Sequence, residues 1–169
     1  DAFARGEDIH RVTAAEVLGK PAATLTRDER NRAKAVNFGI IYGISSFGLS
    51  EQLGISREEA QAYIDTYLAR FPRVNEFIAR TIASAKELGY VTTLFGRRRN
   101  IPELRARNYQ VRSLGERLAV NTVIQGTAAD VMKLAMIGAH RALAAEGLAT
   151  RLILSIHDEL LFEGPPAEK

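Results

Sequence analysis

The sequence contains no cysteine among its 169 residues, and this absence removes two kinds of chemistry. Neither a disulfide framework nor a thiolate metal site can form, so any bound metal must take oxygen or imidazole ligands. A chain without thiols also fits a reducing compartment. We therefore expect a cytoplasmic location.

Long apolar runs are absent as well. No stretch approaches the roughly 20 apolar residues that a membrane helix needs, and residues 1–5 lack the basic-then-apolar plan of a signal peptide. We expect no membrane partner. The composition, with 46% hydrophobic and 25% charged residues, is that of a globular domain and not of a disordered or fibrous chain.

Basic charge is modest overall but concentrated in one segment. The net charge is only +3, which permits polyanion binding without establishing it. Between Arg97 and Arg117, however, there are seven arginines and only two acidic residues. This segment is either a surface for phosphate contacts or a plain solvated face.

Helix signals dominate the chain, and no repeat or linker marks an internal boundary, so we expect one unit over residues 1–169. Capping boxes at Thr26 and Ser56, each with a glutamate three residues later, predict two helix starts. Together with apolar periodicity and the positions of Gly and Pro, they predict helices over residues 27–42, 57–71, 74–88, 113–121 and 127–145.

Extended segments are few. A short one at residues 90–95 leads into a predicted turn at residues 97–99. Residues 151–156 and 160–163 are apolar runs that read as a β-hairpin, with the chain reversing at residues 157–159. Because an isolated hairpin is marginal in water, we expect its sheet partners to lie outside this chain. The predicted fold class is mainly α, with one β-hairpin from an incomplete sheet.

The first capped helix carries four side chains at intervals of four residues: Arg30, Lys34, Phe38 and Tyr42. Successive members advance by about 40° around the helix and about 6 Å along it, which makes a spiral row roughly 18 Å long. Two cations stand at one end and two aromatic rings at the other. A nucleoside triphosphate has the same polarity, with a polyanionic tail and a flat sugar–base end. The alternative is an ordinary amphipathic helix with solvated cations and core aromatics.

The string Arg-x-x-x-Lys-x-x-x-Phe-Gly-x-x-Tyr-Gly resembles the fingers-helix motif of family A DNA polymerases, the group of bacterial DNA polymerase I. The resemblance implies that Arg30 and Lys34 grip the triphosphate of the incoming dNTP, and that Lys34 donates a proton to the departing pyrophosphate. Phe38 would pack on the incoming sugar and base, and Tyr42 would lie by the templating base. Phe in place of Tyr at position 38 implies discrimination against dideoxynucleotides.

Two further features follow from the same resemblance. Gly39 and Gly43 would supply a hinge at the aromatic end of the row. The segment from Arg5 to His10 is similar to the family segment whose histidine touches the triphosphate, which implies nucleotide binding by His10. Taken alone, His10 reads as an ordinary surface or capping histidine.

The tripeptide His157-Asp158-Glu159 between two apolar strands resembles the palm motif of the same family. A tight turn on a hairpin projects a carboxylate into a fixed place, and Mg²⁺ prefers hard oxygen ligands. The resemblance implies Asp158 as the catalytic metal ligand, Glu159 as a catalytic residue that supports this site, and His157 as a contact to the primer end. Ser155 departs from the glutamine of the best-known members. An aspartate in a turn is also common for purely structural reasons.

Arg117, Asn121 and Gln125 lie four residues apart, and with residues 126–130 they resemble the family helix that follows the minor groove of primer–template DNA. Asn and Gln offer both donors and acceptors, which suits them to the acceptors that every base pair presents there. A plain helix surface is the alternative. The basic segment would add phosphate contacts through the arginines at positions 97–99, 105, 107 and 112.

The resemblance covers essentially the whole chain and implies a fragment of a DNA-directed DNA polymerase. Its parts would be helical fingers over about residues 10–110 and a palm portion, with an incomplete palm sheet, over about residues 111–169. Complete enzymes hold two Mg²⁺ ions with two palm aspartates; the second aspartate would belong to a strand before Asp1, and the thumb would lie earlier still. We therefore expect a monomeric fragment that binds dNTP and primer–template DNA weakly and does not polymerise by itself.

Two other function classes stay open at this point. A single-subunit phage-type RNA polymerase shares the Arg, Lys, Tyr and Gly positions, although Phe38-Gly39 and Glu159 favour the DNA enzyme. A non-catalytic helical module that only binds nucleic acid or a partner protein is the other class. Substitution of Lys34 or Asp158 by Ala separates enzyme from module, because only an enzyme loses polymerisation by orders of magnitude.

Overall fold

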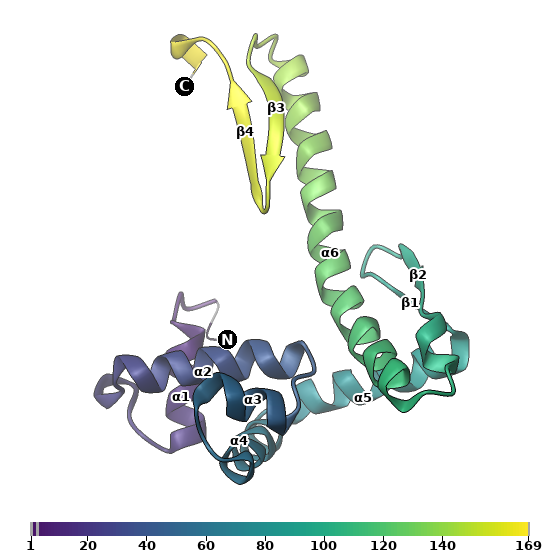
Figure 1. Cartoon of the computed structure of the whole chain (residues 1–169). Coiled ribbons are helices and arrows are strands. Elements are labelled where there is room, and N and C mark those ends of the chain that lie inside the picture. Colours follow the sequence, from purple (N-terminus) through teal and green to yellow (C-terminus); the bar gives the residue numbers. More distant parts are fainter. Residues whose placement is uncertain (1, 3, 169) are drawn as a thin grey trace. The chain divides into compact units, whose positions relative to one another are not determined.

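The computed structural model describes residue 2 and residues 4–168, and most of them are helical. The elements are α1 (Ile9–Leu18), η1 (Ala22–Thr24), α2 (Arg27–Ile41), α3 (Ser46–Leu53), α4 (Arg57–Arg70), α5 (Pro72–Leu88), β1 (Tyr90–Thr92), β2 (Arg98–Asn100), η2 (Pro102–Arg105), α6 (Tyr109–Ala145), β3 (Arg151–Ile156), β4 (Glu159–Glu163) and η3 (Pro166–Glu168) (Figure 1). The predicted mainly α class is confirmed. Within these described ranges, no helix is both long and apolar enough to cross a membrane.

The residues divide into two compact units, and each is described by itself. The first unit comprises Asp1–Val91 and Asn100–Asn121, and it contains α1 to α5 and the start of α6. The second comprises Thr92–Arg99 and Thr122–Lys169, and it contains the rest of α6 and the β3–β4 hairpin. The boundary between fingers and palm near residue 110 stays a prediction.

Helix α2 begins at the predicted capping box. The Thr26 hydroxyl accepts a hydrogen bond from the Glu29 backbone N–H at 3.2 Å, and the Glu29 carboxylate accepts one from the Thr26 backbone N–H at 2.9 Å. The hydrogen bond from the Lys20 ammonium, followed by that from the Thr26 N–H, lowers the pKa of Glu29 to about 2. The carboxylate is therefore ionised near neutral pH and supports the start of α2.

Helix α2 ends in a Schellman motif, one residue before the predicted end. The Ile44 N–H donates to the Gly39 carbonyl at 2.8 Å, and the Gly43 N–H donates to the Ile40 carbonyl at 3.0 Å. Gly43 has a φ of +70°, which favours glycine, and the Ile44 side chain lies 2.7 Å from where a Cβ on Gly39 would be. The geometry at the end of α2 therefore explains why both positions are glycine.

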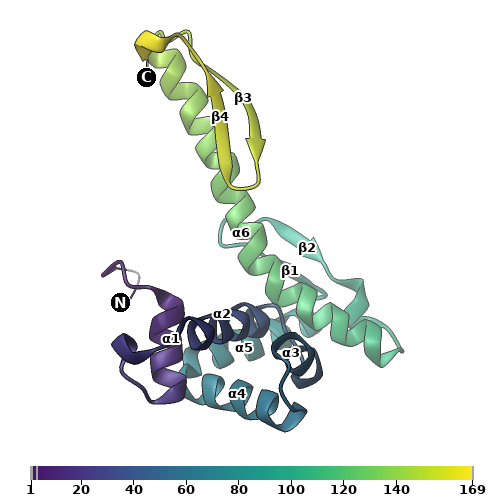
Figure 2. The ribbon, with the colours of Figure 1, turned by 60° about the vertical axis from the view of Figure 1, so that its left-hand side comes forward.

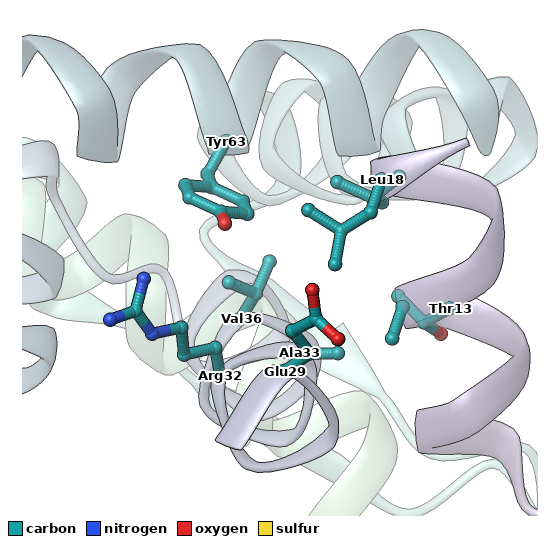
Figure 3. Close-up of a pocket in the computed structure, with 9 residues that line it drawn as sticks. Thr13, Leu18, Glu29, Arg32, Ala33, Val36 and Tyr63 are labelled. Carbon is teal, nitrogen blue, oxygen red and sulfur yellow. The ribbon is translucent and has the colours of Figure 1, made fainter. Parts of the chain in front are cut away.

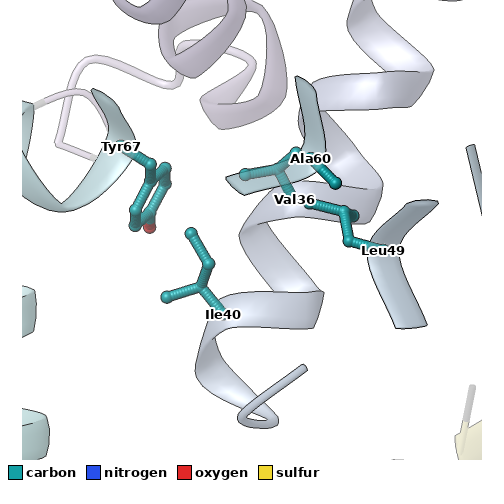
Figure 4. Close-up of a cluster of buried hydrophobic side chains, with 5 residues drawn as sticks. All are labelled: Val36, Ile40, Leu49, Ala60 and Tyr67. Carbon is teal, nitrogen blue, oxygen red and sulfur yellow. The ribbon is translucent and has the colours of Figure 1, made fainter. Parts of the chain in front are cut away.

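The inner face of α2 forms the core of the first unit, in which α2 packs against α1, α3 and α4 (Figures 1 and 2). Val36 and Ile40 of α2 pack with Leu49 of α3 and with Ala60 and Tyr67 of α4 (Figure 4). Each fully buried aliphatic side chain of this kind contributes about 1.5–3 kcal/mol. This packing holds α2 in a fixed rotation about its axis and leaves its opposite face accessible.

A small apolar cavity of about 10 Å³ remains between α1, α2 and α4. Leu18 of α1, Ala33 and Val36 of α2 and Tyr63 of α4 line it (Figure 3). This volume is at the lower limit for a single water molecule. The cavity therefore offers no room for a nucleotide, and the candidate site lies on the outer face of α2.

Two helices of the first unit were not predicted. Asp8 caps α1 and Ser45 caps α3, but the residues three positions later are Arg11 and Gly48, so neither start has the glutamate of a capping box. Helix α5 starts at Pro72 and not at residue 74, because proline is tolerated in the first helical turn.

The two helices predicted on either side of Gly126 are one helix, α6. Its cap is Asn108, ahead of the predicted start at residue 113, because the Asn108 carboxamide oxygen accepts hydrogen bonds from the backbone N–H groups two and three residues later. Gly126 costs about 1 kcal/mol relative to alanine in a helix. A Cβ there would lie 2.8 Å from the Thr93 methyl group, so this glycine serves close packing and does not break the helix.

Strands β3 and β4 form the predicted antiparallel hairpin. Ile156 lies opposite Glu159, so the reversal takes only His157 and Asp158. The prediction that Glu159 lies in the turn is therefore wrong, since Glu159 is the first residue of β4. His157 has a φ of 53°, the left-handed conformation that a two-residue hairpin turn requires. A second short hairpin, β1–β2, was not predicted.

Candidate functional site

The four residues at intervals of four lie along one accessible face of α2 and its C-cap. The helix buries the residues of its inner face: Ala33, Val36, Asn37, Gly39 and Ile40. Lys34 is exposed and Arg30 half-buried, while Phe38 and Tyr42 are 45% and 43% exposed. The alternative of a helix with core aromatics is therefore wrong. The binding roles of the four residues stay predictions.

Three rings lie next to one another at the aromatic end of the row. Phe38 and Tyr42 are parallel to within 10°, with ring centroids 6.3 Å apart. The imidazole of His10, on α1, lies on Phe38 at 5.6 Å and is tilted by 51°. The predicted nucleotide-binding residues His10, Phe38 and Tyr42 are thus contiguous, and they present a partly exposed aromatic surface of the kind on which a base or sugar packs.

An open groove of about 430 Å³ runs beside these rings. Phe38, Tyr42 and Gly43 line it together with Arg117, which comes from the start of α6 in the same unit. The Arg117 side chain lies 2.7 Å from where a Cβ on Gly43 would be. The structure therefore brings one of the predicted DNA-facing residues to the aromatic end of the row.

At the other end of the row, Arg30 is held by an acidic residue that the sequence reading did not single out. Arg30 Nε donates to Asp8 Oδ2 at 2.6 Å, and Asp8 Oδ1 accepts from the backbone N–H groups of His10 and Arg11. The hydrogen bond from Arg30 makes the largest contribution to lowering the pKa of Asp8. Partial desolvation of the carboxylate acts in the opposite direction and raises this pKa. The signal that could have found Asp8 is an aspartate directly before an apolar-periodic segment.

His10 is held on its other side by a second missed residue, Asn37. Asn37 Nδ2 lies 3.0 Å from His10 Nδ1 and 3.0 Å from Thr13 Oγ1. Burial lowers the pKa of His10, and the nearby Arg30 and Lys34 cations lower it further, against an opposing effect of Asp8. His10 is therefore mainly neutral at pH 7. The signal for Asn37 is a polar residue on the apolar face of the predicted helix.

In the second unit, the hairpin turn brings the palm-like residues together. His157, Asp158 and Glu159 are all exposed and follow one another at the tip of β3–β4. Among residues 2 and 4–168, no group of three His, Asp or Glu side chains could hold a metal ion. The turn thus offers an accessible carboxylate pair that needs further ligands to bind a cation.

The predicted turn at Arg97–Arg99 is wrong. The backbone reverses just before it, where the Gly96 N–H donates to the Thr93 carbonyl at 3.0 Å and the Thr93 N–H donates to the Arg97 carbonyl at 3.0 Å. Arg98 and Arg99 therefore belong to strand β2. The extended conformation follows from this earlier reversal, which places β2 beside β1.

Two arginines of the basic segment make side-chain hydrogen bonds within the second unit. Arg97 Nε donates to Asp130 Oδ1 at 2.6 Å, and Arg97 Nη2 donates to the Gly126 carbonyl at 2.8 Å. Arg99 Nη1 donates to Thr122 Oγ1 at 2.9 Å. These contacts anchor β2 to α6. A role of the basic segment in phosphate contacts stays a prediction.

The remaining two predicted DNA-facing residues differ in exposure. Asn121 is half-buried, and its Oδ1 atom is buried without a hydrogen-bond partner among the described residues. Gln125 is exposed and borders a small cleft beside Thr122 and Arg97. Gln125 belongs to the second unit and Asn121 to the first.

Comparisons with known proteins agree with one another. A sequence model of DNA polymerase family A matches residues 1–169. The chain is 49% identical over 168 residues to DNA polymerase I of Streptococcus pneumoniae (strain R6), which covers 99% of this chain and 19% of that protein. It is 52% identical over 163 residues to DNA polymerase I of Pseudomonas aeruginosa (strain PAO1), which covers 96% of this chain and 18% of that protein.

A solved structure is also similar. It is the POL domain of Pol1 from M. smegmatis in complex with a DNA primer-template and dNTP, with a TM-score of 0.92 and 43% sequence identity. The match covers 99% of this chain and 30% of that one. The chain thus spans about a fifth of the length of these curated relatives and less than a third of the solved structure. From the full-length match of the family model and the identity to these relatives, the chain belongs to DNA polymerase family A.

Proposed function

We propose that this chain is part of a DNA-directed DNA polymerase, in which it binds the incoming dNTP and primer–template DNA for nucleotidyl transfer. The observation that carries the proposal is the outer face of α2, where two cations lead to the stacked, accessible rings of Phe38 and Tyr42. The family supports the reaction class, and the solved relative holds DNA primer-template and dNTP.

The cationic end of this face suits the triphosphate. The Nε–H of Arg30 is used by Asp8, so the guanidinium is held in one orientation while its Nη groups can fork onto phosphate oxygens. Lys34 adds an exposed point charge one helical turn later. In this proposal Lys34 also donates a proton to the departing pyrophosphate, which lowers the charge on the leaving oxygen.

The aromatic end suits the nucleoside. Phe38 would pack on the sugar and base of the dNTP, and His10 would donate to the triphosphate from the adjacent position. Tyr42 would lie by the templating base, near the groove that Arg117 also lines. Arg117, Asn121 and Gln125 would follow the minor groove of the duplex, with His157 at the primer end.

Polymerases of family A depend on metal ions, and we infer that the ions here are two Mg²⁺. The carboxylate of Asp158 fits one, because Mg²⁺ commonly takes one or two protein carboxylates and completes its shell with water and substrate phosphates. Glu159, which follows it in β4, would support that position. A bound Mg²⁺ supplies positive charge to the attacking and leaving oxygens of the phosphoryl transfer.

We further infer that the isolated chain is a monomer that binds dNTP and DNA weakly and does not extend a primer. It spans about a fifth of the curated relatives, and its described residues contain no group able to hold a metal ion alone. Since the relatives are bacterial DNA polymerases, the cytoplasm is the proposed location.

Template-directed primer extension by the full-length protein tests the proposal. The variants Lys34→Ala and Asp158→Ala should lose extension by orders of magnitude with dNTPs, while a non-catalytic binding module would be little changed. Equal extension with rNTPs in place of dNTPs would contradict the proposed use of dNTPs. Extension by the isolated chain would contradict the inference that it is inactive alone.

A further inference from the structure

Asn37 is a polar residue on the buried face of α2. Its residue exposure is 8%, and its neighbours on that face are apolar, among them Val36 and Ile40. A buried carboxamide costs free energy unless it is hydrogen-bonded. The contacts of Asn37 are therefore the reason why this position can be polar.

The polarity of these contacts follows from Thr13. The Thr13 hydroxyl donates its single hydrogen to the Ile9 carbonyl at 2.9 Å, so its oxygen accepts from Asn37. The group of Asn37 that faces Thr13 is thus the NH₂ and not the carbonyl oxygen. The second hydrogen of the same NH₂ points at His10 Nδ1, 3.0 Å away.

The tautomer of His10 follows from that contact. A neutral imidazole has one nitrogen that donates and one that accepts. When Nδ1 accepts from Asn37, the proton is on Nε2, and this N–H is free to donate outward. The ring is fixed on its other side by Phe38, at a centroid distance of 5.6 Å.

We propose that Asn37, oriented by Thr13, is a positioning residue that keeps His10 in its Nε2–H tautomer, so that His10 donates a hydrogen bond to an anionic oxygen of the bound ligand. The ligand class, a triphosphate, rests on the proposed function. The assignment of the tautomer does not, because it depends only on contacts within the first unit. Asn37 itself reaches no ligand from the buried side of α2.

Imidazole ¹⁵N NMR of the chain tests the proposal directly. The chain has only three histidines, and a His10→Gln variant identifies the His10 signals. At a pH where the ring is neutral, the proton of His10 should be on Nε2. In Asn37→Asp the carboxylate can only accept, so the proton should move to Nδ1. Asn31→Asp, on the exposed side of the same helix, makes the same chemical change and should leave the tautomer unchanged.

Two results would overturn the proposal. One is a wild-type His10 that carries its proton on Nδ1, and the other is a folded Asn37→Asp chain with the wild-type tautomer. If Asn37→Asp does not fold, Thr13→Val decides instead. It removes the hydroxyl that orients the amide at nearly constant volume, and it should leave His10 as a mixture of both tautomers. A pure Nε2–H form in that variant would also contradict the role of Thr13.

Titration with tripolyphosphate and with dATP separates this proposal from the proposed function. Asn37→Ala adds no charge, and it should weaken the binding of either probe by roughly 3- to 10-fold, the effect of one hydrogen bond. No response of the wild-type His10 signals to either probe would reject the proposed nucleotide site. Unchanged affinity in Asn37→Ala, with binding by the wild type, would reject the role of Asn37.

Discussion

The outer face of α2 and the β3–β4 turn both carry residues of a polymerase motif, but the structure supports them in different ways. At the outer face of α2, side-chain contacts hold the residues in place: Asp8 contacts Arg30 of α2, and Asn37 of α2 contacts His10 of α1. At the hairpin tip, His157, Asp158 and Glu159 project from a two-residue turn and are exposed. One site is organised by side-chain contacts, the other by backbone geometry alone.

This difference teaches what each region needs from its ligands. In the proposed function, a triphosphate would meet Arg30 and His10 in orientations that their contacts already set, so less conformational entropy would be lost on binding. The carboxylates of the turn can approach a cation only together with other oxygen ligands, such as water and phosphate. Substitutions in the two regions should therefore differ in their effects on binding, turnover and stability.

The largest expected effect is on turnover at the hairpin tip. Asp158→Asn in the full-length polymerase removes a hard anionic ligand from the proposed Mg²⁺ site, which is worth several kcal/mol in the transition state, or about 10²–10³-fold in kcat. Single-turnover primer extension measures it. The thermal midpoint should not change, because Asp158 is exposed. Extension at the wild-type rate would show that this carboxylate holds no catalytic metal.

A smaller loss is expected on α2. Lys34→Ala removes one charge-assisted contact to the triphosphate and the proposed proton donor, which together correspond to about 10²-fold in kcat/KM for dNTP. Arg32→Ala is the matched control, because Arg32 is an exposed cation on the other side of the same helix and should change kcat/KM little. Equal losses in both variants would indicate a general charge effect and contradict a specific site.

Stability should separate the two regions with one pair of matched substitutions. Ile40→Ala opens a cavity in the core beneath α2, where Ile40 is 5% exposed, and should cost about 2–4 kcal/mol. Ile156→Ala, next to the hairpin turn and 48% exposed, should cost less than about 1 kcal/mol. Urea unfolding of the chain, followed by circular dichroism, measures both. A larger cost for Ile156 would mean that the turn is buried in solution.

The smallest expected effect is on the pKa of His10, beside the outer face of α2. Burial and the cations Arg30 and Lys34 lower the pKa of His10, while Asp8 opposes them. The stability that His10 contributes is thus present above its unfolded pKa of about 6.5 and is lost as the pH falls through the folded value. An NMR titration should therefore give the His10 imidazole a pKa below about 6.5.

A pair of charge variants sharpens this pH prediction. Arg30→Gln removes a neighbouring cation and releases Asp8, so both changes should raise the pKa of His10. Arg32→Gln removes an exposed cation of the same helix that is not among the charges acting on His10, and it should leave the pKa of His10 unchanged. A His10 pKa above that of a free histidine in the unmodified chain would contradict the burial and charges seen around the ring.

Much of the fold could be predicted where the local signals are strong. The capping boxes at Thr26 and Ser56 predicted the starts of α2 and α4 correctly. Helices α1 and α3 begin at single caps without the reciprocal glutamate, and such caps also occur in turns. Gly126 lies inside α6 where a Cβ would meet Thr93, a contact between residues far apart in the sequence that no local pattern contains.

The candidate site shows the same limit. Spacing alone predicted that Arg30, Lys34 and Phe38 share one face, and the structure places them on the outer face of α2. The supporting residues could not be found in this way, because Asp8 and Asn37 act across two helices, and their pairing depends on how α1 packs on α2. Tertiary packing also decided that Arg97 contacts Asp130.

The most direct test of the central claim is a titration of the chain with dATP, followed by backbone and imidazole NMR. If the outer face of α2 binds the nucleotide, the largest shifts should occur at His10, Lys34 and Phe38, and Lys34→Ala should weaken the binding. Shifts confined to other parts of the chain, or equal binding by Lys34→Ala, would contradict the account.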